Sequence, residues 1–148
     1  MPNTTSTPSN IYRIRVAVSV HVYDCFDYSL TAEQYQQAQV GARVAVSFGR
    51  QSLIGIIVEK LTPDTPIDPR FKLKAITELL DEQAILDQKI LSLLTWSAQY
   101  YQFPIGEVFQ SALPTFLRQG KPYNLLARMW NVLDLHAEAK VTRSEKQQ

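Results

Sequence analysis

The sequence predicts an α+β fold, in which a small, mostly antiparallel β-barrel or sheet is followed by two or three packed helices. Two observations support this prediction. Up to about residue 80, apolar and polar residues alternate in several short runs, which is the period of half-buried strands. From about residue 85, apolar residues recur at helical spacing instead. Several short strands joined by hairpin-length links favour a small, OB-like barrel or sheet.

The clearest strand covers residues 12–22, where β-branched residues recur at every second position. The face expected to be buried consists of Tyr12, Ile14, Val16, Val18, Val20 and Val22. The face expected to be polar consists of Arg13, Arg15, Ala17, Ser19 and His21. A second extended piece follows over residues 23–30. Residues 31–39 are polar and predict a loop or one helical turn, with Thr31 as N-cap and Gln34 three positions later.

Residues 40–48 alternate again and predict a third strand. A turn over residues 49–52 joins it to a fourth strand, residues 54–58, in what we expect to be a hairpin. Gly55 inside the fourth strand predicts a β-bulge or a close backbone approach.

A loop containing three prolines, residues 62–70, and a last extended stretch, residues 71–80, complete the β part. We expect Leu73, Ala75 and Leu79 of the last stretch to share one face.

The helical part begins at Asp87, a suitable N-cap residue. The apolar stripe of the first helix consists of Ile90, Leu91, Leu94, Ala98 and Tyr101. Residues 103–108 end this helix and start a second one, with Pro104 suited to its first turn. We expect Pro114 to close or kink the second helix and residues 118–122 to form its exit loop.

We expect three segments along the chain. Residues 1–10 predict a disordered tail without the features of a signal peptide. Residues 11–122 predict one domain, with a β part over about 11–80 and a helical part over about 85–120. Residues 123–148 predict a linker that leads into something longer.

The composition limits the function. A net charge of +1 argues against a long electrostatic track along nucleic acid but leaves room for a site that takes one or two phosphates. One cysteine, Cys25, excludes an internal disulfide framework and a cysteine zinc module, and fits a reducing cytoplasm. No apolar run approaches the length of a membrane span. The chain also lacks a P-loop and metal-ligand spacing, so we expect no catalytic residues, metal or cofactor within it.

The best candidate site is the aromatic–acid–aromatic triplet Phe26-Asp27-Tyr28 at the end of a strand-like run. A carboxylate between two rings suits a small pocket that packs against a flat group and accepts a hydrogen bond. The alternative interpretation is structural, because Phe-x-Tyr at period two also places two rings in a core.

Beyond this triplet, five collinear stretches between residue 12 and about residue 122 resemble one family. They are Phe26-Asp27-Tyr28 and residues 40–50, 54–58, 73–76 and 100–120. The family is the N-terminal 3′-DNA-binding domain of PriA, the bacterial replication-restart helicase also called primosomal protein N′. Residues 143–148 resemble the start of the winged-helix domain that follows in that family.

The resemblance implies a module that captures the 3′-hydroxyl end of a DNA strand, with a pocket of Phe26, Asp27, Tyr28, Gly49 and Lys74. In that pocket Asp27 would accept the hydroxyl proton, and the two rings would pack on the terminal sugar or base. Gly49 would permit close backbone approach, and Lys74 would pair with Asp27 or contact the last phosphate. We add Arg50 and Lys72 as candidate phosphate contacts.

The resemblance also implies the biological setting. The full-length family member is an ATP-dependent 3′–5′ DNA helicase that uses ATP, Mg and Zn, whereas this chain alone is expected to bind without catalysing. The expected partners are DNA, primosome proteins and single-strand-binding protein, with no membrane. We expect a monomer in the bacterial cytoplasm, associated with the nucleoid. Two other functions stay open: a protein-docking module within the primosome, and a small RNA-binding barrel that would depend on 2′-hydroxyls.

Overall fold

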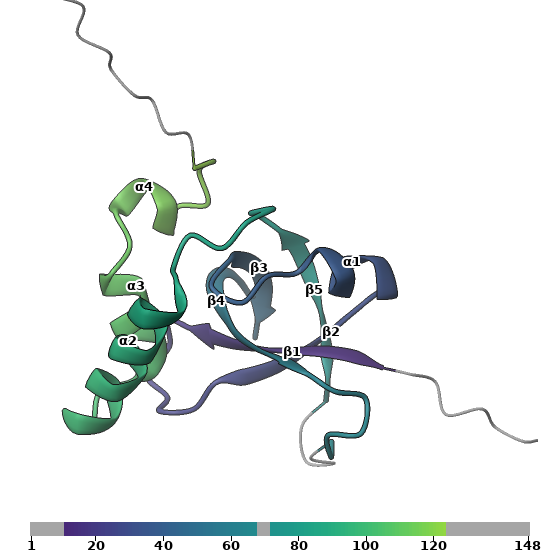
Figure 1. Ribbon diagram of the computed structural model, residues 1–148, viewed down its shortest axis with the longest axis horizontal. Helices are drawn as coiled ribbons and strands as arrows, with labels where there is room; N and C mark the ends of the chain where they lie inside the picture. Colours follow the sequence, from purple (N-terminus) through teal and green to yellow (C-terminus); the bar gives the residue numbers. More distant parts are fainter. Residues whose placement is uncertain (1–10, 68–71, 124–148) are drawn as a thin grey trace, which may run out of the picture.

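The computed structural model describes residues 11–67 and 72–123, where five strands close into a barrel (Figure 1). The strands are β1 (Tyr12–Val18), β2 (Phe26–Leu30), β3 (Arg43–Phe48), β4 (Gln51–Leu61) and β5 (Lys74–Leu79). They follow the order β1-β2-β5-β3-β4 around the barrel, with β2 and β5 parallel and the other pairs antiparallel. The predicted small, mostly antiparallel, OB-like barrel is confirmed.

One helix lies within the barrel connections and three follow the last strand. They are α1 (Ala32–Gln37), α2 (Gln88–Tyr100), α3 (Ile105–Ser111) and α4 (Thr115–Arg118). Both predicted caps are present: Thr31 and Gln34 form a reciprocal capping box, and Asp87 accepts from the Ile90 amide at 2.8 Å. No described helix has both the length and the apolar character that a membrane crossing requires. The expected tail over residues 1–10, and all but Tyr123 of the expected segment 123–148, lie outside the described residues.

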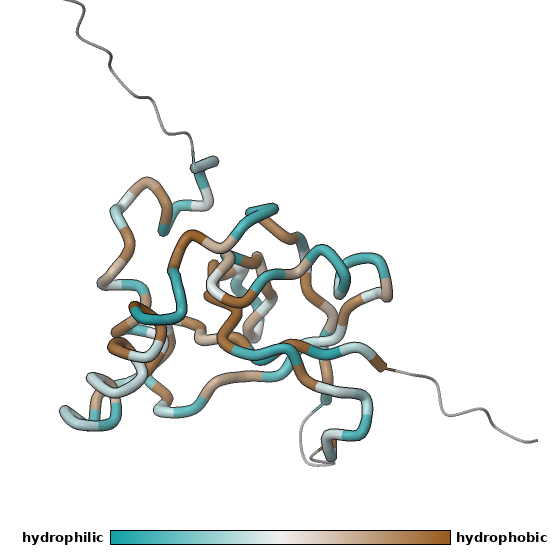
Figure 2. Tube along the Cα trace, in the orientation of Figure 1, coloured by the Kyte–Doolittle hydropathy of each residue, from teal (hydrophilic) through white to brown (hydrophobic). Residues whose placement is uncertain are grey.

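Two apolar cores hold the described chain together, and β1 contributes to both. One fills the barrel and includes Ile14, Val16 and Val18. The other lies between barrel and helices and includes Ala17 together with Phe109, which is fully buried. Figure 2 shows hydrophobic stretches gathered in the barrel strands, whereas α1 is mostly hydrophilic. The prediction that one face of β1 is polar is therefore wrong at Ala17, because the helices cover it.

The prediction is also wrong at Arg13, whose side chain is 1% exposed. Its guanidinium donates to the carbonyl oxygens of Thr65 and Pro66, so the loop after β4 folds back over this cation. These contacts join β1 to a loop more than fifty positions later in the chain.

The helices approach the barrel closely where glycine permits it. A Cβ atom on Gly106 would lie 1.7 Å from the carbonyl oxygen of Val18, at the end of β1. Gly55 fulfils the prediction of a close backbone approach, since a Cβ atom there would lie 3.0 Å from the Ala17 carbonyl oxygen and 2.3 Å from Val16 Cγ1. The irregularity in the β1–β4 pairing lies between Arg15 and Val16 instead.

Two strand predictions were wrong in detail. The first strand ends at Val18 rather than at Val22, because the Val20 and Val22 amides donate back to the carbonyls two positions earlier, as in a turn. In β5 the buried residue is Ile76, and Ala75 is exposed. The register shift in the β3–β5 pairing opposite Ala45 and Val46 changes the phase of the alternation.

Three helix predictions were also wrong in detail. Ile90 and Tyr101 of the predicted α2 stripe are 41% and 69% exposed, so that helix buries a narrower face than expected. Pro114 closes no helix: α3 ends at Ser111, and Pro114 precedes α4. Arg118, expected in a loop, is the last residue of α4.

Candidate functional site

An open cleft of about 1460 Å³ collects most of the predicted site residues. It is lined by Phe26, Asp27, Tyr28, Gly49, Lys72 and Lys74. Arg50, the remaining candidate, is exposed in the β3–β4 turn and does not line the cleft. The cleft continues from the barrel to the end of α2, where Gln102 and Phe103 line it.

The barrel topology places the triplet at the cleft. β2 pairs with β5 only through Tyr28 with Lys74 and Ser29 with Ala75, because β5 begins at Lys74. Phe26 and Asp27 therefore extend beyond the end of β5 and have no β5 partner. The same pairing sets Lys74 beside Tyr28.

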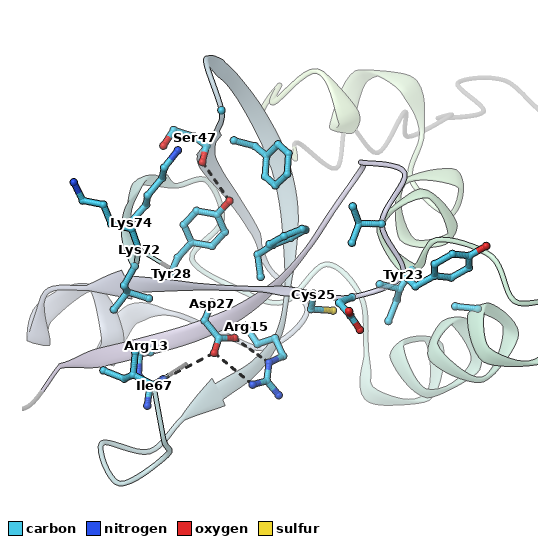
Figure 3. Close-up of a pocket in the computed structure, with 18 of the residues that line it drawn as sticks. Arg13, Arg15, Tyr23, Cys25, Asp27, Tyr28, Ser47, Ile67, Lys72 and Lys74 are labelled. Atoms are coloured by element: carbon cyan, nitrogen blue, oxygen red, sulfur yellow. Dashed lines mark hydrogen bonds and ion pairs between the residues drawn. The ribbon is translucent and has the colours of Figure 1, made fainter. Parts of the chain in front are cut away.

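Asp27 is held by an arginine that sequence reasoning did not assign to the site. Arg15 donates from Nε to Asp27 Oδ1 at 2.9 Å and from Nη2 to Oδ2 at 3.4 Å (Figure 3). This hydrogen bond raises the pKa of the Arg15 guanidinium. Arg15 also donates to Glu59 at 3.0 Å, and Arg13 Nη1 lies 3.9 Å from Asp27 Oδ2. Arg15 thus bridges the carboxylates of Asp27 and Glu59, and the buried cation of Arg13 lies beside Asp27.

The predicted pairing of Lys74 with Asp27 is not what the described residues show. The ion pairs of Asp27 within residues 11–67 and 72–123 are with Arg15 and Arg13. The signal for Arg15 was available, because an antiparallel pairing of the first two predicted strands can place Arg15 opposite Asp27. Arg13 gave no such signal, since its burial depends on the distant loop.

The two rings of the triplet differ from each other. Tyr28 is 3% exposed in the barrel core, and its hydroxyl donates to the Ser47 carbonyl at 3.3 Å. Burial raises the pKa of this hydroxyl. Phe26 is half-buried and meets Phe48 edge-on, with ring centroids 4.9 Å apart. The structural interpretation of the triplet therefore holds for Tyr28, which supports the cleft wall from the core rather than offering an open ring face.

The barrel rim of the cleft is open and cationic. Lys72 and Lys74 are both exposed. Gly49 has a φ of +59°, and a Cβ atom there would meet nothing within 4 Å, so backbone conformation rather than crowding favours glycine. The charged lining consists of Arg13, Arg15, Lys72 and Lys74 against Asp24 and Asp27. This balance favours a ligand that carries a small number of negative charges.

Neither metal ligation nor thiolate chemistry is indicated at the cleft. No group of three His, Cys, Asp or Glu side chains converges as a metal site within the described part of the chain. Cys25 lines the cleft, but burial raises the pKa of its thiol to about 11, so it is a neutral thiol at neutral pH.

Comparison with known proteins identifies the family. Residues 15–114 match the family model described as the 3′DNA-binding domain (3′BD) of PriA. The chain is similar to the replication restart protein PriA of Haemophilus influenzae, at 35% identity over 140 residues, which is 90% of this chain and 18% of that protein. It is also similar to the proteins of the same name from Buchnera aphidicola subsp. Schizaphis graminum (29% identity, 54% of this chain, 11% of that protein) and Treponema pallidum (29%, 64% and 15%).

The chain spans less than a fifth of the length of each of these relatives. The family match, in contrast, covers residues 15–114 and therefore includes β2, the β3–β4 turn and β5, which carry the cleft residues. Because that match extends over more than half of the chain, the protein belongs to the family of PriA 3′DNA-binding domains.

Proposed function

We propose that the cleft captures the free 3′-hydroxyl end of a DNA strand without reading its base. The setting would be a stalled or abandoned replication fork, and the chain would act as the DNA-end sensor of a larger replication-restart helicase. The observation that supports this most directly is that Phe26, Asp27, Gly49 and Lys74 line one open cleft in a chain of this family.

Asp27 would accept the hydrogen bond from the terminal hydroxyl. A carboxylate has about four acceptor positions on its two oxygens. Arg15 occupies one on each oxygen, which leaves acceptor capacity on both and fixes their orientation. The carboxylate is 28% exposed, so a ligand can reach it. A donor that arrives at the end of a DNA strand therefore finds a pre-oriented acceptor.

The phosphate side of the ligand would lie toward Lys72 and Lys74. Both lysines are exposed at the barrel rim, and both follow the loop that Arg13 holds against β1. Contacts to one or two phosphates predict weak binding with a shallow dependence on salt concentration. We include Arg50 only as an outer phosphate contact, because it lies outside the cleft lining.

Base independence would follow from the kind of side chains in the cleft. Phe26 and Phe48 line it with partly buried rings, and packing against a ring tolerates any base. Selection for the hydroxyl would come from Asp27, since a 3′-phosphate brings negative charge toward a carboxylate. Arg13 and Arg15 reduce that repulsion, so we expect a moderate preference for the hydroxyl end rather than exclusion of the phosphate.

The test compares fluorescence anisotropy of one short single strand with a 3′-hydroxyl and with a 3′-phosphate. Wild type is compared with Asp27→Asn and with the matched variant Glu78→Gln, which removes an exposed carboxylate of β5 outside the cleft. We expect wild type and Glu78→Gln to prefer the hydroxyl, and Asp27→Asn to bind both strands alike. Equal binding of both strands by wild type would contradict end capture. The same strand made as RNA tests the RNA-binding alternative, which requires tighter binding of the RNA.

A protein-docking role is the second candidate. Trp96 and Tyr100 stack on α2 with centroids 5.0 Å apart, and they are 54% and 66% exposed. Exposed aromatic pairs are common at protein interfaces. Primosome proteins and single-strand-binding protein are the partners we propose for this role. Trp96→Ser would then weaken partner binding in a pull-down with purified proteins and leave the hydroxyl preference unchanged.

A further inference from the structure

The end of the cleft beside the helices is not used in the proposed capture of the terminal hydroxyl. Tyr23 and Phe103 line it with side chains that are 65% and 50% exposed. Figure 3 shows Tyr23 on the helical side of Asp27, with Lys72 and Lys74 on the opposite side. The cleft therefore has a cationic end on the barrel, an acidic residue in the middle and an aromatic end at the helices.

The backbone at the aromatic end is strained. Gln102 is the one non-glycine residue with positive φ, at 49°, in the described ranges. It closes α2 by a Schellman arrangement, in which its amide donates to the Gln99 carbonyl at 3.4 Å and that of Phe103 to the Ala98 carbonyl at 3.0 Å. Glycine is the usual residue at this position because an L side chain is disfavoured there. Gln102 nevertheless places a side chain on the cleft lining, and strained residues of this kind cluster at ligand sites.

The volume of the cleft also exceeds what one terminal nucleotide requires. Pockets for small molecules usually measure about 300–1,000 Å³. The cleft measures about 1460 Å³, although it is open to solvent on one side. A ligand held at Asp27 therefore leaves the aromatic end unfilled.

We infer that the aromatic end is a subsite for the bases that precede the 3′-terminal nucleotide of a single strand. The inference rests on the proposed function, because Asp27 sets where the strand begins. Exposed rings such as Tyr23 and Phe103 stack with bases of any identity. The Gln99 and Gln102 amides, which also line the cleft, can donate to and accept from base edges.

Charge decides which part of the strand enters the subsite. Asp24 lines the cleft here, and α2 ends here, so a carboxylate and the negative end of a helix dipole lie on the same side. Both disfavour phosphate groups. The bases would therefore enter the aromatic end, while the backbone would lie toward solvent and toward the lysines of the barrel rim.

The test is competition against a labelled strand by two hexanucleotides with 3′-hydroxyl ends. One contains six thymidines, and the other keeps only the 3′-terminal thymidine and carries abasic residues at the five preceding positions. The two have equal charge, so their difference reports base contacts alone. We expect wild type to bind the all-thymidine hexamer about fivefold more tightly, or better, since one stacked base contributes about that factor.

The double variant Tyr23→Ser/Phe103→Ser is expected to lose this difference. Phe116→Ser, which removes a 44% exposed ring of α4 outside the cleft, is expected to keep it. Equal binding of the two hexamers by wild type, with the 3′-hydroxyl preference intact, would overturn the inference and leave the proposed function standing. Absence of any hydroxyl preference in wild type would instead contradict the proposed function.

Gln102→Gly separates the subsite from a role in folding. Glycine suits the left-handed backbone, so this variant is expected to unfold at a higher temperature than wild type. The difference in affinity between the two hexamers should also be smaller in this variant, because the Gln102 amide is missing. A difference as large as that of wild type would overturn the role assigned to Gln102.

Discussion

Arg15 and Asp27 face each other across the antiparallel β1–β2 pair, and the arginine Nε lies 2.9 Å from Asp27 Oδ1. Arg15 Nη1 also donates to Glu59 on β4, the neighbour of β1 on the other side. The proposed acceptor of the 3′-hydroxyl is therefore positioned by the barrel itself, through three adjacent strands. This arrangement makes Arg15 a positioning residue for the end-binding site.

Arg15→Gln tests that positioning role. The variant keeps Asp27 but replaces the guanidinium that orients its carboxylate with a shorter, neutral amide, so we expect the affinity for the 3′-hydroxyl strand to fall several-fold. The free energy of unfolding should change by only about 0.2–1 kcal/mol, because the Arg15 side chain is 39% exposed and such pairs are screened by solvent. Anisotropy with that strand and urea denaturation measure the two quantities. Arg118→Gln, on α4 away from the cleft, is the matched control for the lost charge, and an unchanged affinity in Arg15→Gln would contradict positioning.

Arg43→Met tests what attaches the helices to the barrel. Arg43 is fully buried, pairs with Asp81 at 2.6 Å and donates to the carbonyls of Leu117 and Lys121, each at 2.8 Å. Its removal leaves the nearly buried Asp81 carboxylate without its cation. It also leaves the carbonyl oxygens of Leu117 and Lys121 without this donor. We expect a loss of about 3–5 kcal/mol in the free energy of unfolding, measured by urea denaturation.

Arg118→Met is the control for that measurement, because Arg118 is exposed and its side chain contacts Thr115 on the same short helix. Its effect should stay within about 0.5 kcal/mol. A similar, small effect for both variants would show that the Arg43 network does not hold the two parts together.

Gly106→Ala tests the close contact between α3 and β1. The added methyl group would lie 1.7 Å from the Val18 carbonyl oxygen, which is backbone and cannot rotate away. Either α3 moves outward or β1 shortens, and we expect a loss of at least about 1–3 kcal/mol, the usual range for overpacking. Thermal unfolding with Ser111→Ala, an exposed position of the same helix, gives the comparison. Equal midpoints for the two variants would contradict the close packing.

Local sequence patterns were sufficient to predict the strands and helices but not to predict which of their faces are buried. The capping box at Thr31 and the cap at Asp87 each depend on residues that are neighbours in sequence, and both occur in the structure. The alternating run that begins at Tyr12 does form β1, but its burial does not alternate, because Arg13 and Ala17 on the expected polar face are buried. The phase of β5 was wrong because a register shift against β3 breaks a strict period of two. Arg13 was placed on a polar face because nothing near it in sequence shows that a loop will cover it.

The candidate site was likewise predicted where a sequence motif indicates the residues, and missed where only the fold brings them to the cleft. The resemblance brought forward Phe26, Asp27, Gly49 and Lys74, and we added Lys72 as a phosphate contact; the fold gathers all five in one cleft. It could not reveal that Tyr28 faces the core, because the Phe-x-Tyr pattern is the same for a core strand and for a binding strand. Arg15 and Gln102 were missed because neither is among the pocket residues that the resemblance implied: the position of Arg15 at the site depends on strand register, and that of Gln102 on a left-handed backbone.

Cys25 offers a chemical probe of the cleft beside Asp27. Burial raises the pKa of its thiol from an ordinary value of 9.0 to about 11, and the thiolate is the reactive form. The rate of modification by iodoacetamide should therefore rise through pH 9–11 instead of levelling off near pH 9.

The raised pKa of Cys25 also makes the stability depend on pH. Between pH 9 and 11 the unfolded chain releases the thiol proton before the folded chain does, so the free energy of unfolding falls as pH rises. Cys25→Ala should show less of that fall. Because Cys25 lines the cleft, a saturating 3′-hydroxyl strand should slow its modification by iodoacetamide at pH 8. In the absence of DNA, a modification rate that levels off near pH 9 would show that the thiol is not buried as the structure places it.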